Sequence, residues 1–566
     1  MLSVEHLSPK KRILLSQSLD DFDARWDEEY ALLKSWEDGV AYHGTRESVF
    51  YALALLIRRS SGDVERAVRI LHTVLSLQFL DPTQLWHGTF RYGPEYAAPP
   101  RSPFDTDRLS PEARWQGDVL WERVCSAFMT RLQAKPFLSP EAESIGRELS
   151  AALTDVFPVV WKTYDPNWRE FILSSFALIL EEFDTLLPAE TVQAMEAAAR
   201  AGIAGARSRT EKDLTPLNTN VKVMHVFCFD AFARRFHDQN LADYISGFAS
   251  RFLRDYRQYH AVCEFNSPTY NGVVLSYTGL LRSRGGSPAV RELGVVLEEG
   301  LWEDLADFYN PAMETLCGPF SRAYGMTIDG TALPMLMYLC FDSLPVETPP
   351  PFGPETESAC ILCCSEPAIP AAVQKNLTES RGERQVRRLF RELAERGKPG
   401  DNHALCTATA WITDSLMLGA MKGSANTSHQ LHACTVHWRN SGGTLSGLRL
   451  RRRTADGQLI HLRTVFLDLT AEPRRIFGTV RNDSALPVVC NFEIESPHAA
   501  SGVYQEENWQ VDGLHCRPAF RISGADGASR RVIASSRILQ EDQVWCNIPL
   551  LPGETLNLDL SFSLDS

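Results

Sequence analysis

The hydrophobic period changes once along this chain, and that change separates two kinds of fold. From about residue 10 to residue 345, apolar residues recur at steps of three and four, as in the segments 48–59, 64–78 and 171–183, and this spacing predicts amphipathic helices. From His403 onward the period is two, which predicts strands. Because no helical segment interrupts the strands, we expect an antiparallel β-sandwich after this point.

Breakers and capping residues cut the helical part into paired segments joined by short loops. Six such hairpins can close into a ring of inner and outer helices, an (α/α)6 toroid, or continue as an open solenoid. A solenoid would repeat itself about every 34 or 40 residues, and the sequence shows no such self-similarity. The predicted fold class is therefore α+β and multidomain, with an N-terminal (α/α)6 toroid of about twelve helices followed by a C-terminal antiparallel β-sandwich.

A proline-rich stretch lies between the two parts. The segment LPVETPPPFGPETES (344–358) has neither a helical nor a strand pattern, so it is predicted to be a linker. A charged amphipathic helix is expected from Ala371 to Glu395. The predicted domains are a helical toroid that carries the active site (1–343), the linker with its connecting helix (344–402) and the β-sandwich (403–566).

Charge and composition exclude several classes of partner. The chain carries 71 acidic and 57 basic side chains, a formal net charge of −14, whereas nucleic-acid and anionic-membrane surfaces require a basic face. No apolar run reaches the roughly 18 residues of a membrane-spanning helix, and the N-terminal residues lack the pattern of a secretory signal. We therefore expect a cytoplasmic protein that binds a small molecule or an oligosaccharide, and neither a nucleic acid nor a membrane.

Cysteine usage and the lack of familiar motifs limit the chemistry. The 13 cysteines are widely spaced and mostly in apolar surroundings, which favours free buried thiols over disulfides. No P-loop, dinucleotide-binding glycine motif, nucleophile elbow or zincin motif is present. The interpretation is an enzyme that needs neither a metal nor a cofactor. The stretch LRLRRR (448–453) alternates within an expected strand and is predicted to form a solvated basic face.

Polar residues crowd one turn in CEFNSPTYNG (263–272), directly before an expected helix. Pro268 keeps the preceding residue extended, so the polar side chains around it are preorganised. Glu264, Asn266 and Tyr270 are therefore candidate site residues. The alternative is a capping loop, in which these side chains bind only backbone groups and pack.

The segment LTPLNTNVKVMH (214–225) places polar residues at another expected helix start. Asn218, Asn220 and His225 lie on its opening turns, and the two asparagines cannot both cap the same helix. His225 lies on an otherwise apolar face, where a histidine is either a proton carrier or, more often, a satisfied core residue.

In CGPFSRAYG (317–325), Arg322 and Tyr324 follow a Gly-Pro turn. An arginine fixed by such a turn suits a bidentate contact with a carboxylate, and the alternative is an ion pair with an interior glutamate. Weaker candidates combine aromatic and polar residues at helix-connecting positions, as ligand clefts do. They are His43, Arg46, His87, Arg91, Asp165, Asn167 and Trp168, of which His87, Asn167 and Trp168 are taken as candidate site residues.

Several of these segments together resemble a known group of proteins. The similarity lies in six segments that span most of residues 40–330: HGTRESVFYALALL, LSLQFLDP, DPNWREF, LTPLNTN, EFNSPTYNGV and GPFSRAYG. They are similar to segments of (α/α)-toroid plus β-sandwich proteins, which distantly resemble heparinase II/III-type and alginate-type polysaccharide lyases. TAWITDSLMLGAMKG, near the start of the expected sandwich, also resembles the β-domain of these proteins.

The resemblance implies a mechanism. Such lyases cleave a glycosidic bond by β-elimination: a clamp neutralises the uronate carboxylate, a base removes the C5 proton, and a tyrosine protonates the leaving oxygen. Carried over, it implies Tyr270 as the acid or base, and Asn218 or Asn220 with Arg322 as the groups that stabilise enolate-like charge. A second proton carrier would be His225 or His87. The substrate would be bound by Asn220, Glu264, Asn266, Tyr324, His87, Trp168 and Asn167.

Three functions follow as predictions. The first is a lyase that acts by proton abstraction and elimination on a uronate-containing saccharide in the toroid cleft. The second is an intracellular biosynthetic dehydratase, isomerase or cyclase (including one for a pericyclic cyclisation) that acts on a hydrophobic secondary metabolite. The third is a non-enzymatic binding protein, in which the polar clusters are only caps. The sequence departs from the extracellular lyases in two ways: it lacks a clear equivalent of their Asn-His-Tyr-Arg order, and its N-terminal residues lack the pattern of an export signal.

Overall fold

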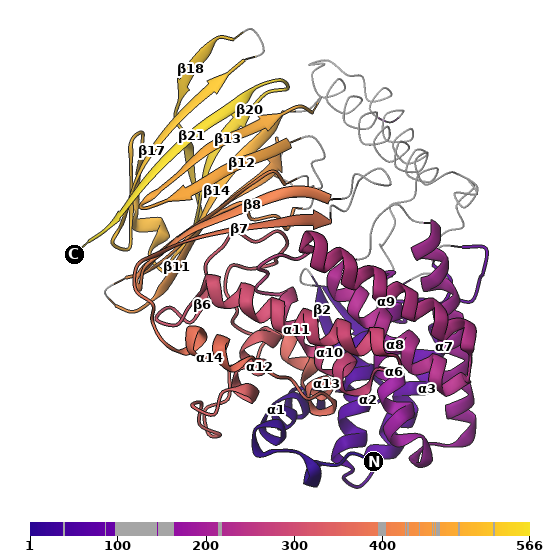
Figure 1. Ribbon diagram of the computed structural model, residues 1–566. Helices are drawn as coiled ribbons and strands as arrows, with labels where there is room; N and C mark the ends of the chain where they lie inside the picture. Colours follow the sequence, from indigo (N-terminus) through magenta and orange to yellow (C-terminus); the bar gives the residue numbers. More distant parts are fainter. Residues whose placement is uncertain are drawn as a thin grey trace. The chain divides into compact units, whose positions relative to one another are not determined.

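The structure, a computed structural model, describes residues 1–37, 40–84, 86–96, 144, 164–212, 218–393, 403–424, 426, 429–440, 442–455, 457, 459, 465–484, 487–524 and 527–565. The chain forms two compact units. Unit 1 comprises Met1–Arg254, Gly272–Glu298 and Asp329–Ala368, and unit 2 comprises Asp255–Asn271, Glu299–Ile328 and Ile369–Ser566. The predicted fold class is confirmed, because helices dominate the chain up to Thr378 and antiparallel sheets follow (Figure 1).

Twelve α-helices lie in the described residues, ten of them before residue 343. They are α1 (Pro9–Arg25), α2 (Thr45–Arg58), α3 (Asp63–Ser76), α6 (Trp168–Phe183), α7 (Ala189–Lys212), α8 (Thr219–Phe236), α9 (Gln239–Tyr259), α10 (Tyr270–Arg284), α11 (Pro288–Phe308), α12 (Ala332–Cys340), α13 (Ala359–Cys364) and α14 (Ala371–Thr378). The helices predicted from the three apolar segments 48–59, 64–78 and 171–183 are confirmed as α2, α3 and α6.

The inner helices of unit 1 close into a ring. α2 packs on α6, and α6 packs on α8. The rings of Phe227 in α8 and Tyr277 in α10 are 6.0 Å apart. Gly279 of α10 faces Ser365, which directly follows α13, and α13 packs in turn against α2.

Outer helices cover this ring. α2 and α6 are buried along almost their whole length, as expected for helices that are apolar on all sides. α3 packs on α2 and on α7, and it buries only the face that carries its apolar residues. The toroid of inner and outer helices is therefore present within unit 1 (Figure 1).

The β-region is a sandwich of two sheets. The first sheet has the strand order β19-β20-β14-β11-β10-β9-β8-β7-β4, and the second has the order β12-β13-β21-β17-β16-β15, with β18 on β17. Every described pair in these sheets is antiparallel except β4 with β7. The ring centroid of Phe492 in the first sheet lies 5.6 Å from that of Trp509 and 5.4 Å from that of Phe520, both in the second sheet. The two sheets therefore share an apolar core.

The strands have the following bounds: β4 (Ala261–Val262), β7 (Arg384–Leu393), β8 (His403–Ile412), β9 (Leu416–Lys422), β10 (Cys434–Arg439), β11 (Leu445–Thr454), β12 (Val465–Glu472), β13 (Arg475–Asn482), β14 (Val488–Glu495), β15 (Val503–Gln505), β16 (Asn508–Val511), β17 (Leu514–Ser523), β18 (Ser529–Val532), β19 (Ser535–Gln540), β20 (Gln543–Leu550) and β21 (Thr555–Leu564). Two smaller sheets consist of β1 (Trp26–Asp27), β2 (Leu32–Glu37) and β3 (Val40–Gly44), and of β5 (Tyr309–Asn310) and β6 (Thr315–Leu316).

The connecting helix predicted from Ala371 to Glu395 is wrong over Arg384–Leu393, and residues 394 and 395 lie outside the described residues. α14 ends at Thr378, and Arg384–Leu393 forms strand β7, which pairs with β8 along its whole length. Exposure alternates residue by residue along β7, the period expected for a strand. The charged residues that suit an exposed helix face lie here on alternate sides of a sheet.

The solvated basic face predicted for LRLRRR is also wrong. The residues lie in β11 as a strand, but Arg451, Arg452 and Arg453 are buried. Arg453 forms an ion pair with the buried Glu493, and the Arg452 Nη1 donates to the Val465 carbonyl oxygen at 2.7 Å. Interior partners from other strands therefore replace water around these guanidinium groups.

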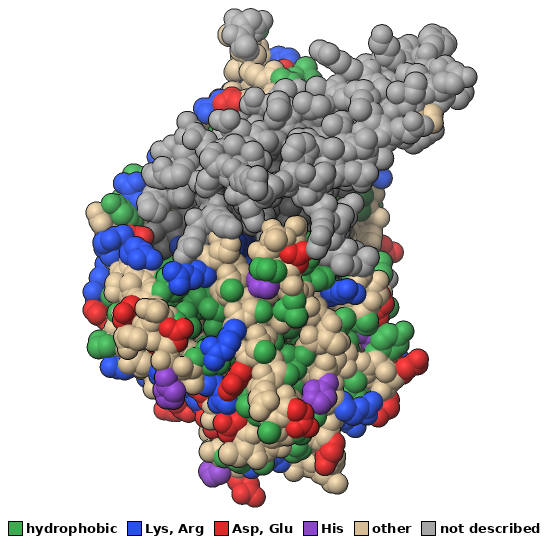
Figure 2. Space-filling model, turned by 90° about the vertical axis from the view of Figure 1, so that its right-hand side faces the viewer, with side chains coloured by type: hydrophobic (Ala, Val, Ile, Leu, Met, Phe, Trp, Pro, Cys, Tyr) green, Lys and Arg blue, Asp and Glu red, His purple; other side chains and the backbone are tan. Residues whose placement is uncertain are grey.

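Two expectations for the whole chain can be compared with the described residues. Their 12 cysteines are all free, and all but Cys340 are buried, which confirms the prediction of free thiols. None of the helices described is both long and apolar enough to cross a membrane. Figure 2 shows acidic and basic side chains interspersed over the described part of one face.

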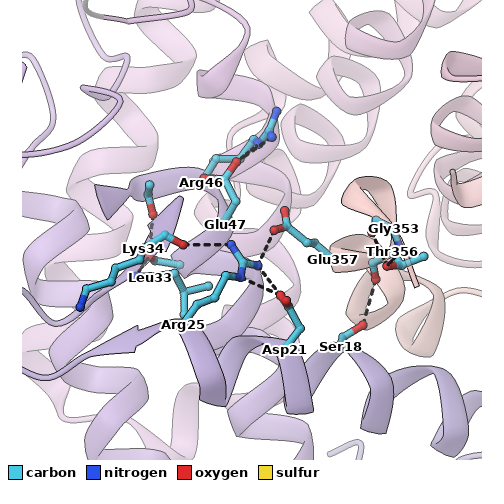
Figure 3. Close-up of polar contacts among 12 residues, drawn as sticks. Ser18, Asp21, Arg25, Leu33, Lys34, Arg46, Glu47, Gly353, Thr356 and Glu357 are labelled. Atoms are coloured by element: carbon cyan, nitrogen blue, oxygen red, sulfur yellow. Dashed lines mark hydrogen bonds and ion pairs between the residues drawn. The ribbon is translucent and has the colours of Figure 1, made fainter. Parts of the chain in front are cut away.

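The proline-rich stretch predicted as a linker belongs to unit 1 and makes polar contacts with it. The Arg25 side chain in α1 lies between Asp21 and Glu357, and the Ser18 hydroxyl donates to the Thr356 carbonyl oxygen at 2.9 Å (Figure 3). Glu357 and Thr356 belong to a short 3-10 helix, Pro354–Ser358. The C-terminal end of the proline-rich stretch is thus held against α1.

Glu357 makes the stability of the folded state depend on pH. Burial and the nearby Glu47 raise the pKa of Glu357 from 4.5 to about 8, in spite of Arg25 and Arg46. Between these pH values the folded chain holds a proton that the unfolded chain releases. The stabilising contribution is therefore complete below pH 4.5 and is lost as the pH rises through 8. We expect Glu357→Gln to flatten this slope in urea unfolding curves, whereas the exposed control Glu29→Gln should leave it unchanged.

Candidate active site

Tyr270 is the first residue of α10, and Ser267 holds the turn before it. The Ser267 Oγ accepts a hydrogen bond from the Tyr270 backbone N–H at 3.0 Å and donates to the Arg322 carbonyl oxygen at 2.6 Å. Pro268 lies between the two, where the sequence predicts a fixed turn. The loop that carries Arg322 is thereby joined to the start of α10, so the first and third predicted clusters meet within unit 2.

Arg322 lies between a buried carboxylate and the face of the Tyr270 ring. Its Nη1 is 3.0 Å from the Glu264 Oε1, and its guanidinium carbon is 4.5 Å from the ring centroid of Tyr270. Glu264 is 2% exposed, so little water competes for this ion pair. The contact is the interior ion pair that the sequence offers as the alternative to a substrate clamp.

The Tyr270 hydroxyl is buried beside Gln430. Its oxygen is 3.3 Å from the Gln430 Nε2 and 3.4 Å from the Oε1. Burial raises the pKa of the Tyr270 phenol well above 10, although Arg322 opposes this effect. The ring centroids of Tyr324 and Tyr270 are 5.8 Å apart, and Tyr324 is 63% exposed. Tyr270 is therefore a neutral phenol with a proton to donate, next to an exposed aromatic ring.

Asn266 holds the backbone of the same loop. Its Nδ2 donates to the carbonyl oxygens of Cys317 at 2.7 Å and Pro319 at 3.1 Å. Its backbone is left-handed, with φ of 52°, a region that asparagine enters more easily than most residues. These contacts fit the capping-loop alternative for Asn266.

His225 is buried in α8, within unit 1, and both ring nitrogens face polar groups. The Nδ1 is 3.2 Å from the Glu170 Oε1, and the Nε2 is 3.4 Å from the Tyr244 hydroxyl. The imidazole stacks on Phe229 with ring centroids 3.8 Å apart. This environment is that of a satisfied core histidine.

Asn218 and Asn220 lie at the start of α8. Asn218 occupies the N-cap position without a side-chain capping bond to the helix. Asn220 is buried, and its Oδ1 accepts from the Val221 N–H at 2.9 Å. Residues 214–217 of this predicted cluster lie outside the described residues. Asn218, Asn220 and His225 belong to unit 1, whereas Tyr270 and Arg322 belong to unit 2.

Trp168 brings together segments that are far apart in the sequence of unit 1. It begins α6, and its ring is 4.7 Å from that of Tyr92. The guanidinium carbon of Arg46, at the start of α2, lies 5.3 Å from the Trp168 ring. Arg46 in turn pairs with Glu47 at 2.6 Å. The buried Trp168 indole thus packs against the Arg46 guanidinium group.

His87 and Asn167 contact buried arginines near the same helix start. The His87 carbonyl oxygen accepts from the Arg169 Nε at 2.9 Å, and the Asn167 Oδ1 accepts from the Arg209 Nη1 at 2.8 Å. Burial and the Arg169 charge lower the pKa of the His87 imidazole, and burial lowers the pKa of Arg169 to about 10. His87 is therefore neutral at physiological pH.

Histidines of the β-region are engaged with protein groups. The Arg451 Nη1 donates to the His432 Nε2 at 2.6 Å, and the His437 Nε2 donates to the Met326 carbonyl oxygen at 2.9 Å. Among the described residues, no group of three His, Cys, Asp or Glu side chains has the arrangement of a metal site.

Sequence reasoning missed Gln430. It lies in a polar stretch between two strands, with no turn or motif to single it out. Long-range backbone contacts bring it to Tyr270, among them the hydrogen bond from the Ala323 N–H to the Gln430 carbonyl oxygen at 2.9 Å. No local pattern in the sequence encodes these contacts.

Several solved structures show a low similarity to the chain. Heparinase III has a TM-score of 0.34 and 7% identity, covering 83% of this chain and 78% of that chain. The Streptomyces coelicolor A3 chondroitin AC lyase, in complex with chondroitin sulphate, has a TM-score of 0.34 and 10% sequence identity. The match covers 97% of this chain and 83% of the lyase chain. A mutant heparan sulfate lyase HepC from Pedobacter heparinus has a TM-score of 0.28 and 9% sequence identity. The match covers 98% of this chain and 88% of the HepC chain. No curated protein matches the chain.

A family model matches the helical part of the chain. It covers residues 12–111 and 148–341, which together are more than half of the 566 residues. The matched stretches include the segments that carry Tyr270 and Arg322, and also the start of α8. The chain therefore belongs to the family described as Domain of unknown function (DUF8769).

Proposed function

We propose that the protein is a lyase-type enzyme that acts by proton transfer and elimination on a uronate-containing saccharide, with Tyr270 as the general acid. The observation that carries this proposal is the neutral, buried Tyr270 phenol, placed between Gln430 and Arg322. A general acid must hold its proton at the working pH and must be fixed in place. The Tyr270 side chain meets both conditions.

Neighbouring residues support a saccharide substrate. The exposed Tyr324 ring beside Tyr270 offers an aromatic face, a common feature of ligand sites with a few fixed polar groups. Tyr270 and Arg322 lie in EFNSPTYNGV and GPFSRAYG, two of the segments that resemble a group of uncharacterised toroid proteins, and that group distantly resembles polysaccharide lyases. The substrate class in the proposal comes from that resemblance.

The proposed elimination needs one proton from Tyr270. A base removes the proton next to the uronate carboxylate, the C–O bond to the leaving sugar breaks, and the leaving oxygen takes the phenolic proton. A new C=C bond conjugated with the carboxylate remains in the product. Arg322, held by Glu264, lies over the ring and stabilises the phenolate that forms.

Tyr270→Phe tests this role directly. We expect kcat to fall about 10²–10⁴-fold, the range for loss of a general acid, because phenylalanine keeps the ring but has no proton to give. The measurement is the ultraviolet absorbance of the unsaturated product from a panel of uronate oligosaccharides. Tyr256→Phe is a matched control, since Tyr256 is another buried tyrosine of unit 2 and its hydroxyl has no hydrogen-bond partner among the described residues.

The pH profile gives a second reading. Because the Tyr270 pKa lies well above 10, loss of activity on the alkaline side below pH 10 would belong to another group. An intact protein that eliminates none of the uronates would contradict the proposal. The biosynthetic enzyme and the binding protein would then be the predictions left to test.

A further inference from the structure

A side chain from the β-region reaches the hydroxyl of Tyr270. Gln430 is 5% exposed, and its backbone carbonyl oxygen accepts from the Ala323 N–H at 2.9 Å. Two residues further on, His432 and Phe320 exchange both backbone hydrogen bonds, at 2.9 and 3.1 Å. This strand-like pairing fixes the backbone from which the Gln430 side chain extends.

Both ends of the Gln430 amide are within reach of the same phenol oxygen. The distances to the Tyr270 hydroxyl are 3.4 Å for the Oε1 and 3.3 Å for the Nε2. An amide oxygen only accepts hydrogen bonds, and an amide nitrogen only donates them. A neutral phenol can therefore donate to the Oε1, and a phenolate can accept from the Nε2, without rotation of the glutamine side chain.

We propose that Gln430 is a positioning residue of this site, whose amide holds the Tyr270 oxygen both before and after proton transfer. The inference rests on the proposed acid role of Tyr270. Hydrogen bonds to an ionised acceptor are about twice as strong as neutral ones. Gln430 therefore favours the phenolate over the phenol and makes the proton easier to release.

The charged groups near Tyr270 leave part of the cost of forming the buried phenolate to be offset by a neutral group. The titratable groups that face the Tyr270 phenol are Arg322, Tyr324 and Glu264. Arg322 and Glu264 are paired with each other and act on the phenol in opposite directions, because Arg322 favours the phenolate and Glu264 disfavours it. Burial disfavours the phenolate, and an amide donor offsets part of that cost without adding a charge to the interior.

The experiment follows the ionisation of Tyr270 and needs no substrate. Difluorotyrosine replaces Tyr270 alone in the full chain, because its phenol ionises at lower pH than that of tyrosine, and fluorine NMR follows the titration while circular dichroism monitors the fold. Two variants are compared with the wild-type glutamine. Gln430→Met has similar length but neither donates nor accepts, and Gln430→Glu has the same shape but loses the donor. Gln505→Met, at an exposed glutamine of the same unit, is the control.

We expect the titration midpoint to rise by about one pH unit in Gln430→Met, the loss of one charge-assisted hydrogen bond, and to rise further in Gln430→Glu. The control should not shift. An unchanged midpoint in Gln430→Met, or a lower one in Gln430→Glu, would overturn the inference. If the methionine variant unfolds, Gln430→Leu takes its place, because leucine also neither donates nor accepts and adds no charge.

This readout separates the inference from the proposed function. A shifted midpoint without elimination of any uronate would refute the lyase function while keeping the contact between Gln430 and Tyr270. An active enzyme with an unchanged midpoint would refute the role of Gln430 and keep Tyr270 as the acid. Where turnover is observed, Gln430→Met should lower kcat more than it changes KM, because the contact acts on proton release and touches no substrate.

Discussion

Replacing Gly419 with alanine should destabilise the protein by about 3 kcal/mol, at the upper end of the usual cost of overpacking. Gly419 lies in β9, and a Cβ added there would meet the carbonyl group of Gly318. Backbone atoms cannot move aside as a flexible side chain can, so either β9 or the loop that continues to Arg322 must shift. We expect urea unfolding to show the loss of stability, together with loss of any Tyr270-dependent activity.

Gly325 is the matched control for this change. It closes the same loop, its backbone needs no positive φ, and a Cβ added there meets no atom within 4 Å. Gly325→Ala should therefore change the free energy of unfolding by no more than about 0.5 kcal/mol. Equal effects at Gly419 and Gly325 would show that the close approach of β9 to Gly318 does not matter for stability.

Removal of the Arg322 charge should have the second large effect. In Arg322→Met, the Glu264 carboxylate stays buried after losing its ion pair, and breaking such a pair costs about 3 kcal/mol or more. Glu264→Gln should cost less, because the Arg322 side chain is 15% exposed and keeps some access to water. Both free energies of unfolding can be measured by urea denaturation.

The double variant shows whether the two side chains act as a pair. Arg322→Met combined with Glu264→Gln should be more stable than Arg322→Met alone, because the buried charge is gone. Additive losses of the two single changes would contradict the ion pair as a stabilising contact. Control measurements on the exposed pair Arg475 and Asp559 should give a much weaker coupling, because water screens both charges.

Local patterns predicted the elements whose burial follows their own sequence. α2, α3 and α6 bury the apolar residues that define their helical period. In Arg384–Leu393 the charges permit a helix equally well, and pairing with β8 decides for a strand. The sequence predicted β11 as a strand but not the burial of its arginines. Their partners, Glu493 and the Val465 carbonyl oxygen, come from other strands, so the local sequence does not reveal them.

The candidate site divides in the same way. The turn before Tyr270 could be predicted, because Ser267 and Pro268 are local signals. The interior partner of Arg322 could be anticipated only as one of two alternatives, and Gln430 could not be found at all. Both depend on contacts between residues that lie 58 and 160 positions apart in the sequence.

The composition of unit 2 has a consequence for synthesis on the ribosome. Asp255–Asn271 and Glu299–Ile328 leave the exit tunnel well before β7 and β8, yet they belong to the same compact unit. Phe265, for example, stacks on Phe390 with ring centroids 4.0 Å apart. Until Phe390 has been translated, Phe265 lacks that neighbour, so this part of the core of unit 2 cannot be completed before its β-region has been made.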